Sequence, residues 1–147
     1  MNTISSLSAS LEDYLEAIYH IVAEKQAARA KDIALRMNVN NSSVTGALHS
    51  LADKGLINYA PYDVITLTTR GKKAAENVVR RHRALCDFFT KVLEVGQDEA
   101  EEAACKMEHG VSRTILERFI HFVDFIENSP QMNFHWTENN GYQFNPD

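Results

Sequence analysis

The feature that most constrains the fold is a change in hydrophobic periodicity within the first half of the chain. Before it, apolar residues recur at helical spacing in three short segments. The first begins at Ser10, the second spans 30–37, and the third ends at Lys54. After it, LINYA at 56–60 and VITLT at 64–68 are rich in β-branched and aromatic residues, and the PYD between them predicts a turn. Three helices followed by a hairpin is the element order of a winged helix-turn-helix module.

Short polar residues mark the expected helix starts. The candidate N-caps are Ser10, Asn41, Ser42, Ser43 and Thr69. The Asp13 side chain can reach back to the Ser10 backbone N–H and complete a capping box. Gly55 suits the end of the third helix.

The second half of the chain predicts three more helices and a polar tail. One runs without Gly or Pro over about 71–93, and another covers 98–109. Ser112 caps the last helix, whose apolar residues occupy too wide an arc for a helix with one buried side. All seven Phe residues lie in this half, so we expect a homodimer surface within 84–127. The tail after Pro130 is polar and is expected to be irregular.

Composition excludes several classes of protein. No apolar run approaches the ~18 residues that a membrane span needs, and MNTISSLSAS lacks the basic and apolar regions of a secretory signal. The expected compartment is therefore the cytoplasm, with no membrane partner. Cys86 and Cys105 are too few for a disulfide scaffold and are expected to be thiols.

Charge is divided unevenly along the chain, although the formal total is −5. Residues 25–83 carry eleven bases and four acids, whereas residues 84–147 carry four bases and twelve acids. A basic middle predicts contact with nucleic-acid phosphates, and an acidic end suits cations. The alternative is a pattern that serves only solubility.

The start of the third helix is the expected base-reading surface, because the recognition helix of such a module enters the major groove by its N-terminal residues. The polar candidates there are Asn41, Ser42, Ser43, Thr45 and His49. Candidates for phosphate contacts, which position without specifying, are Arg29, Lys31, Arg36, Lys54, Arg70, Lys72 and Lys73. A capped and solvated helix start would also explain the polar residues, so the prediction depends on the order of the elements.

Candidate metal ligands stand on three predicted helices. They are Asp13 with Glu16, His82 within RRHR, and Cys105 with Glu108 and His109. Residues three or four apart share one helical face. If the helices converge, carboxylate, imidazole and thiolate groups together suit a first-row divalent ion better than Mg²⁺ or Ca²⁺. Each group also has an alternative explanation. Asp13 and Glu16 fit a solvated acidic face, His82 fits a surface histidine, and Cys105 fits a buried structural cysteine beside a surface Glu-His pair. The spacing of the residues does not require the three helices to converge.

Five segments together resemble the diphtheria-toxin-repressor family of metal-dependent transcriptional regulators: EDYLEAIY, SSVTGALHSLADKGLI, LTTRGKKAA, VVRRHRALCDFF and EAACKMEHGVS. The likeness covers about 8–128 and is closest to the short manganese transport regulator branch. It implies a homodimeric repressor that binds operator DNA when loaded with Mn(II) or Fe(II) and controls genes of metal uptake or homeostasis. Other first-row metals are expected to bind in vitro.

The resemblance assigns the metal positions to Asp13, Glu16, His82, Cys105, Glu108 and His109. Asp13 is the choice of the manganese branch and Cys105 that of the iron branch, so the set is a hybrid. Cys86 stands where iron-type members tend to place a glutamate of a second site.

The expected fold is mainly α-helical and has two functional parts. Residues 1–70 form the winged-helix DNA-binding domain, and residues 71–130 form a helical metal-binding and dimerisation domain that includes the long linking helix at about 70–93. Residues 131–147 are the irregular tail, and no SH3-like third domain is expected.

Two other functions remain open at this point. A small-molecule-responsive winged-helix regulator of the MarR type would look similar, without needing Cys105, Glu108 and His109 on one face. A metallohydrolase would use Glu108 or Asp13 as general base, but the chain has neither H-E-x-x-H nor a strand-turn nucleophile motif. We therefore expect no enzymatic activity.

Overall fold

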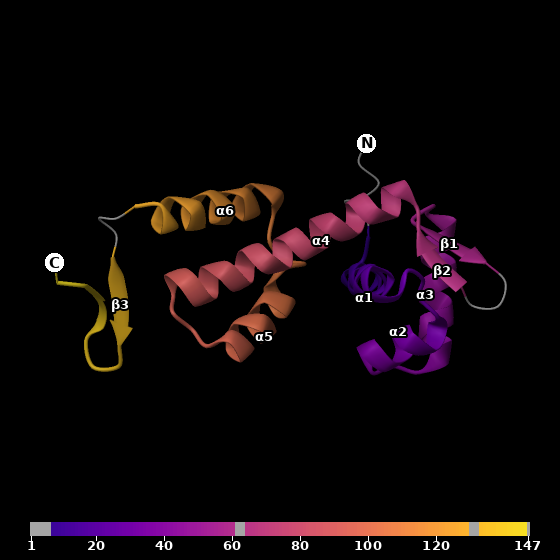
Figure 1. Cartoon of the computed structure of the whole chain (residues 1–147), viewed down its shortest axis with the longest axis horizontal. Helices are drawn as coiled ribbons and strands as arrows, with labels where there is room; N and C mark the ends of the chain where they lie inside the picture. The colour runs from indigo at the N-terminus through magenta and orange to yellow at the C-terminus, as the bar shows by residue number, and fades with distance from the viewer. Residues whose placement is uncertain (1–6, 61–63, 130–132, 147) are drawn as a thin grey trace. The chain divides into compact units, whose positions relative to one another are not determined.

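The computed structural model describes residues 7–60, 64–129 and 133–146, and it divides into two compact units, Met1–Val79 and Arg80–Asp147. Figure 1 shows the order of the elements along the chain. The unit boundary falls within helix α4, Thr69–Asp87. In the ranges described, no helix is both long and apolar enough to cross a membrane.

Three helices and a hairpin make up most of the N-terminal unit, as the periodicity predicts. They are α1 (Ala9–Lys25), α2 (Ala30–Met37), α3 (Asn41–Asp53), β1 (Ile57–Ala60) and β2 (Val64–Leu67). The two strands pair antiparallel, and the expected PYD turn at 61–63 lies outside the described residues. Apolar side chains from all five elements meet in one core, whose fully buried members include Leu15, Ile18, Ile33, Leu48, Leu51 and Ile65.

Two N-caps fall one or more residues earlier than expected. Ser8, not Ser10, caps α1, because its hydroxyl accepts the Leu11 N–H at 3.1 Å. Asn40 caps α3 and accepts the Ser43 N–H at 2.9 Å. Neighbouring Ser and Asn residues offer similar acceptors, so the backbone path decides which one caps the helix.

The junction from α3 to α4 also differs from expectation by one residue. Thr68, not Thr69, caps α4, since its hydroxyl accepts the Gly71 N–H at 3.0 Å. Gly55 follows the end of α3 as expected and has a φ of 71°, in the left-handed region where a side chain would be strained.

The long helix changes character near its end. α4 stops at Asp87, and a π-helical turn over Phe88–Val92 replaces the continuous α-helix expected to residue 93. In this turn the Leu93 N–H donates to the Phe88 carbonyl at 3.1 Å, a bond that spans five residues. The Thr90 hydroxyl donates to a carbonyl one turn earlier, which competes with regular helix bonds.

Two further helices pack against this π-helical turn. They are α5 (Gln97–Met107) and α6 (Arg113–Glu127). α5 ends before the expected residue 109, and Glu108 is its C-cap. Ser112 caps α6 as predicted and accepts the Ile115 N–H at 3.3 Å.

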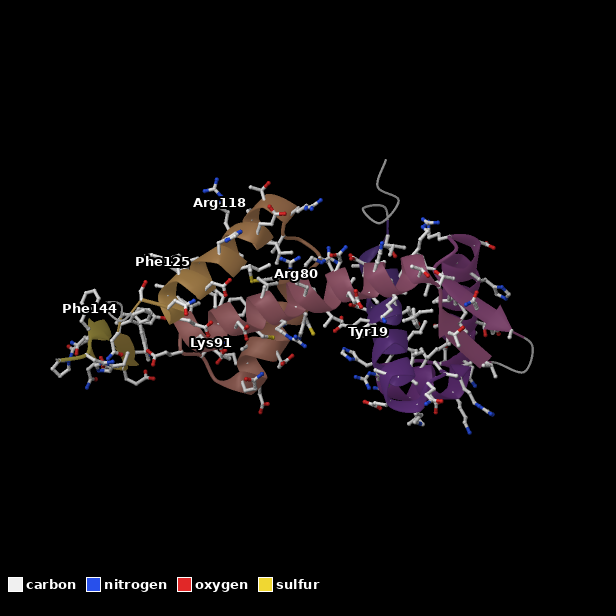
Figure 2. All side chains as sticks on the ribbon, turned by 45° about the horizontal axis from the view of Figure 1, so that its top comes forward. Tyr19, Arg80, Lys91, Arg118, Phe125 and Phe144 are labelled. Atoms are coloured by element: carbon white, nitrogen blue, oxygen red, sulfur yellow. The ribbon has the colours of Figure 1, made fainter. Side chains whose placement is uncertain are left out.

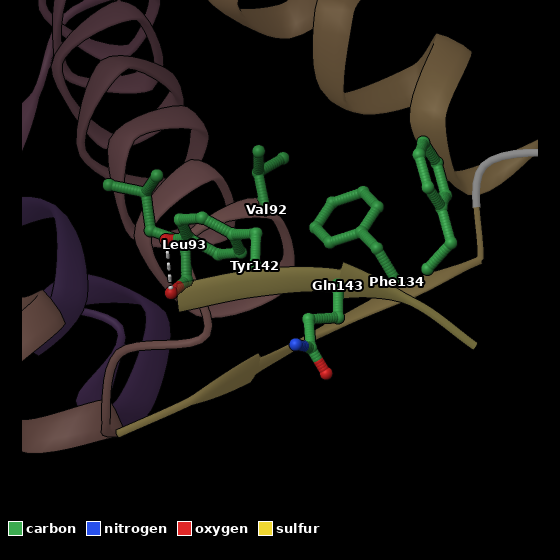
Figure 3. A pocket seen from close by; sticks show the side chains of 6 residues that line it. Val92, Leu93, Phe134, Tyr142 and Gln143 are labelled. Atoms are coloured by element: carbon green, nitrogen blue, oxygen red, sulfur yellow. Dashed lines mark hydrogen bonds between the residues drawn. The ribbon is translucent and has the colours of Figure 1, made fainter. Parts of the chain in front are cut away.

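The tail is a hairpin, so the expectation of an irregular segment over 131–147 is wrong for most of its length. β3 (Phe134–Thr137) and β4 (Gly141–Phe144) pair antiparallel. The Tyr142 hydroxyl donates to the Leu93 carbonyl at 2.8 Å and ties the hairpin to the end of the π-helical turn. An apolar pocket of about 270 Å³ lies beside this bond and is lined by Val92, Leu93, Phe134, Tyr142, Gln143 and Phe144. Figure 3 shows these side chains.

Candidate metal centre and nucleic-acid interface

A histidine of α4 meets a buried carboxylate at the end of α5. His82 Nδ1 lies 2.7 Å from Glu108 Oε2. The Glu108 side chain is only 1% exposed and that of His82 is 17% exposed. Burying a carboxylate is costly unless polar groups compensate for the lost water, so this contact fixes the Glu108 charge in place.

A second histidine contacts the same carboxylate. His109 Nε2 lies 3.1 Å from Glu108 Oε1, and the His109 side chain is 14% exposed. The two oxygens of Glu108 therefore face two different imidazoles. Arg81, beside His82, is also close enough for its charge to interact with Glu108, although burial lowers the pKa of the guanidinium.

Two more groups lie at the other edge of the His82 ring. Glu101 Oε2 is 2.5 Å from His82 Nε2, and Cys86 Sγ is 3.5 Å from the same nitrogen. Burial and, to a lesser extent, the nearby Glu101 charge raise the pKa of the Cys86 thiol to about 12, so the thiol is protonated near neutrality. The hydrogen bond with His82 lowers the pKa of Glu101, which is therefore a carboxylate.

Glu101 was not identified from the sequence. Cys86 was noted only because iron-type members of the family tend to have a glutamate of a second site at that position. Donor atoms of His82, Cys86 and Glu101 all lie within 4.8 Å of one another. The spacing of His82 and Cys86, four residues apart on α4, placed them on one face. Glu101 carried no such signal, because only the packing of α5 beside α4 brings it to the ring.

The remaining predicted ligands are placed as follows. Cys105 is exposed on α5, three residues before Glu108. Asp13 is exposed on α1 of the N-terminal unit, and Glu16 Oε1 lies 3.6 Å from His20 Nε2 on the same helix. The structure thus brings together His82, Glu108 and His109 within the C-terminal unit.

The His82–Glu108–His109 cluster fits a divalent transition metal by its chemistry. It offers imidazole nitrogen and carboxylate oxygen, the mixed donors that such ions prefer. Two donors that bind one ion at ~2.1 Å and a right angle lie about 3 Å apart, close to the 2.7 Å between His82 and Glu108. The Glu108 charge offsets that of a cation, which removes the cost of burying either alone.

The predicted nucleic-acid contacts are all at the surface of the N-terminal unit or the start of α4. The exposed candidates are Arg29, Lys31, Asn41, Ser42, Ser43, Thr45, His49 and Lys72. Two of their hydroxyls have local partners, since Ser42 donates to Asn40 at 2.9 Å and Thr45 donates to the Asn41 carbonyl at 3.0 Å. These bonds hold the start of α3 in a fixed shape.

His49 links the third helix to the hairpin. Its ring meets that of Tyr59 on β1 edge to face, with centroids 5.8 Å apart. On the same hairpin, the Asn58 amide donates to Thr66 at 3.1 Å across the strands. Helix α3 and the hairpin are thereby connected by side chains as well as by the core.

A winged helix followed by a helical unit with a buried imidazole–carboxylate cluster defines the class of metal-responsive DNA-binding regulators. Two family models divide the chain between them. Residues 6–65 match the iron dependent repressor N-terminal DNA binding domain, and residues 68–137 match the iron dependent repressor metal binding and dimerisation domain. The chain belongs to this family, the diphtheria-toxin-repressor family of metal-dependent transcriptional repressors.

Curated relatives match over most of their length. An uncharacterised HTH-type transcriptional regulator of Methanocaldococcus jannaschii is 36% identical over 119 residues, which are 80% of this chain and 95% of that protein. The HTH-type transcriptional regulator MntR of Bacillus pumilus is 34% identical over 83% of this chain and 84% of its own length. MntR of Lysinibacillus sphaericus is 32% identical over 84% and 88%.

Solved structures share the fold. The IdeR structure of T. acidophilum has a TM-score of 0.70 and 26% identity, and the match covers 77% of this chain and 53% of that one. A manganese-dependent transcriptional repressor in complex with manganese has a TM-score of 0.70 and 28% identity over 92% and 63%. The chain therefore spans between about half and two thirds of the length of these solved chains.

Membership decides between the functions that the sequence left open. Regulators of this family are metal-dependent repressors that bind operator DNA as homodimers, and this chain carries both family domains. The resemblance is confirmed, and the MarR-type alternative is not supported. Transcriptional regulators are not a class of enzymes.

Proposed function

We propose that the chain represses metal-uptake or homeostasis genes from the cytoplasm, by binding their operators as a homodimer loaded with Mn(II) or Fe(II). The observation that carries the proposal is the buried Glu108 carboxylate between two imidazoles in a chain with both family domains. In this proposal residues 1–70 bind DNA, and residues 71–130 bind metal and dimerise.

The proposed ligands fall into two sets. The geometry of the C-terminal unit supports His82, Glu108 and His109. The family resemblance supplies Asp13, Glu16 and Cys105, the first two on α1 and the third exposed on α5. The bound cation supplies positive charge among these carboxylates and needs no catalytic step.

The proposed mechanism is thermodynamic linkage. A metal can activate repression only if it binds the DNA-competent arrangement more tightly than the others. Asp13 and Glu16 stand on the helix that packs against the DNA-binding core, whereas Glu108 belongs to the sensing unit. An ion that takes ligands from both units would restrain one against the other, and the free energy of that restraint would favour DNA binding.

The proposed DNA contacts divide by chemistry. Asn41, Ser42, Ser43, Thr45 and His49 read base edges, and Arg29, Lys31 and Lys72 bind phosphates. Ser and Thr can bond several bases, so these contacts specify weakly compared with bidentate ones.

Metal preference is a separate part of the proposal. The MntR relatives and the manganese-bound structure support Mn(II), while a thiolate from Cys105 would favour a softer ion. Replacing Cys105→Glu exchanges a soft donor for a hard one and should move the preference toward Mn(II) over Fe(II). A variant with the same Mn(II)-to-Fe(II) ratio as the parent would remove Cys105 from the ligand set.

The decisive experiment is binding of operator DNA in a series of divalent ions supplied without oxygen. Mn(II) or Fe(II) should raise the affinity of the parent protein and leave Glu108→Ala at its metal-free affinity. Glu102→Ala is a matched control, because the Glu102 side chain is 70% exposed and pairs with Lys106 one turn along the same helix. An operator affinity that is the same with and without every ion would refute the proposed function.

A further inference from the structure

The His82 ring is held at both of its nitrogens by carboxylates of α5 and its C-cap. Nδ1 faces Glu108 at 2.7 Å, and Nε2 faces Glu101 at 2.5 Å. These two carboxylates differ in surroundings, because Glu108 is 1% exposed and Glu101 is 49% exposed.

The two nitrogens of an imidazole point in widely divergent directions, so groups at Nε2 and Nδ1 do not share one ion. The cluster with Glu108 and His109 is reached through Nδ1. Glu101 is therefore on the wrong edge of the ring to join that cluster. Its other oxygen accepts from the Gln97 amide at 3.0 Å, which orients the carboxylate toward the ring.

We propose that Glu101 is a positioning residue, which holds the Nε2–H edge of His82 and presents Nδ1 to the metal. This inference rests on the proposed metal centre. A ligand histidine commonly donates its second N–H to a carboxylate, which selects the tautomer and fixes the plane of the ring. Cys86 closes the same edge of the ring at 3.5 Å and leaves Glu101 as the acceptor for the N–H.

The test compares two adjacent glutamates of one helix. Glu101→Ala removes the acceptor, and Glu102→Ala removes the same charge one residue away without touching His82. Mn²⁺ affinity, measured by titration calorimetry on the full chain, should fall roughly ten-fold in Glu101→Ala and far less in Glu102→Ala. Glu101→Gln should recover part of the loss, because its amide oxygen can still accept the N–H.

A second readout observes the ring itself in metal-free protein. The ¹⁵N resonances of His82 report which nitrogen carries hydrogen and whether it is bonded. Both ring nitrogens face carboxylate acceptors without metal, so Glu101→Ala should shift the Nε2 resonance as its N–H loses its acceptor, while Glu102→Ala should leave the spectrum unchanged.

Three results would overturn the inference. They are an unchanged His82 spectrum in Glu101→Ala, an equal loss of affinity in both alanine variants, and the loss of one bound ion per chain in Glu101→Ala, which would make Glu101 a ligand. His82→Ala separates this inference from the proposed function. If it binds Mn²⁺ like the parent, the proposed centre fails, whereas the ring spectrum still decides whether Glu101 holds His82.

Discussion

Gly71 lies directly against the backbone carbonyl of Leu56. A Cβ at position 71 would come within 1.7 Å of the Leu56 oxygen, a distance that no side chain can occupy. The start of α4 therefore packs through a glycine on the residue that precedes β1, and this contact joins the linking helix to the winged-helix core.

The first prediction is that Gly71→Ala destabilises the N-terminal unit. Overpacking against backbone typically costs about 1–3 kcal/mol, and here the helix start must move as a whole. Gly46→Ala is the control, because its Cβ would meet nothing within 4 Å on α3. Alanine there should stabilise by roughly 0.5–1 kcal/mol, as in other helix interiors. Urea unfolding measures both, and equal midpoints for the two variants would contradict the packing described.

The second prediction concerns the dimer surface on α6. Phe125 is 59% exposed, and Ile115 and Phe122 are also largely exposed on this helix, whereas Leu116, Val123 and Ile126 are buried. Figure 2 shows Phe125 and Arg118 on α6 and Phe144 on the hairpin. Phe125→Glu should give a monomeric mass by light scattering at micromolar concentration, because a buried unpaired charge opposes association. Phe125→Leu should stay dimeric. A Phe125→Glu variant with the mass of a dimer would place the partner surface elsewhere.

The third prediction is a steep salt dependence of operator binding despite the net charge of −5. Basic residues concentrated in 25–83 should displace counterions from the phosphates. Lys31→Ala and Lys72→Ala should each flatten the slope of log affinity against log salt by about one per subunit. Lys106→Ala, which bonds Glu102 in the acidic part of the chain, should leave the slope unchanged. Equal slopes for all three variants would mean that Lys31 and Lys72 do not reach DNA.

The fourth prediction separates the two thiols. Cys105 is exposed, whereas Cys86 is 6% exposed and its pKa is raised to about 12. A raised pKa leaves the thiol protonated, and only the thiolate reacts. Iodoacetamide at pH 8 should therefore label native protein once, at Cys105, and label Cys86 only after unfolding. Mass spectrometry of digested protein gives the site. Labelling of Cys86 at the rate of Cys105 would contradict the burial.

Metal should also protect Cys105 from that reagent. If Cys105 is a ligand, saturating Mn(II) or Fe(II) should slow its labelling several-fold in the parent and not in Glu108→Ala. Unchanged labelling with metal would remove Cys105 from the proposed set and leave the histidine–carboxylate cluster unaffected.

Much of the fold follows from local patterns, and much of the site does not. The hairpin at 56–68 and the Ser112 cap are signalled by β-branched runs and by a short polar residue before an apolar helix. The C-terminal hairpin was not predicted, because the polar residues around it favour irregular structure. Phe134 and Trp136 nevertheless alternate with polar residues in one strand. The alternation was the better signal.

Contacts between helices were beyond the reach of spacing arguments. Spacing predicted Cys105, Glu108 and His109 on one face of a single helix, whereas α5 ends at Met107, and Cys105 is exposed while Glu108 is buried. That His82 lies against Glu108 could not be predicted, since it depends on how α5 packs beside α4. The π-helical turn after Asp87 gave no signal in the spacing either; in it the Phe88 ring packs on Phe119 of α6, with centroids 4.6 Å apart.

The last prediction tests the candidate metal centre at its two most enclosed residues. Glu108→Gln keeps the shape of the side chain and removes the charge that offsets a cation, and His109→Ala removes one imidazole. Both variants should retain helical content by circular dichroism and lose the metal-dependent gain in operator affinity. Weak nonspecific DNA binding should survive in both, because Arg29, Lys31 and Lys72 are untouched and phosphate contacts carry that affinity.

The two substitutions should also differ in stability without metal. Glu108→Gln removes the charge that His82, His109 and Arg81 all face, so its stability should fall further than that of His109→Ala, because buried partners lose their counter-charge. His109→Ala leaves Glu108 with one imidazole fewer and should lower stability, by about 1–3 kcal/mol for a lost bond to a charged group. Thermal unfolding of metal-free protein measures this order. If both variants still respond to metal like the parent, the ion binds elsewhere and the buried cluster is only structural.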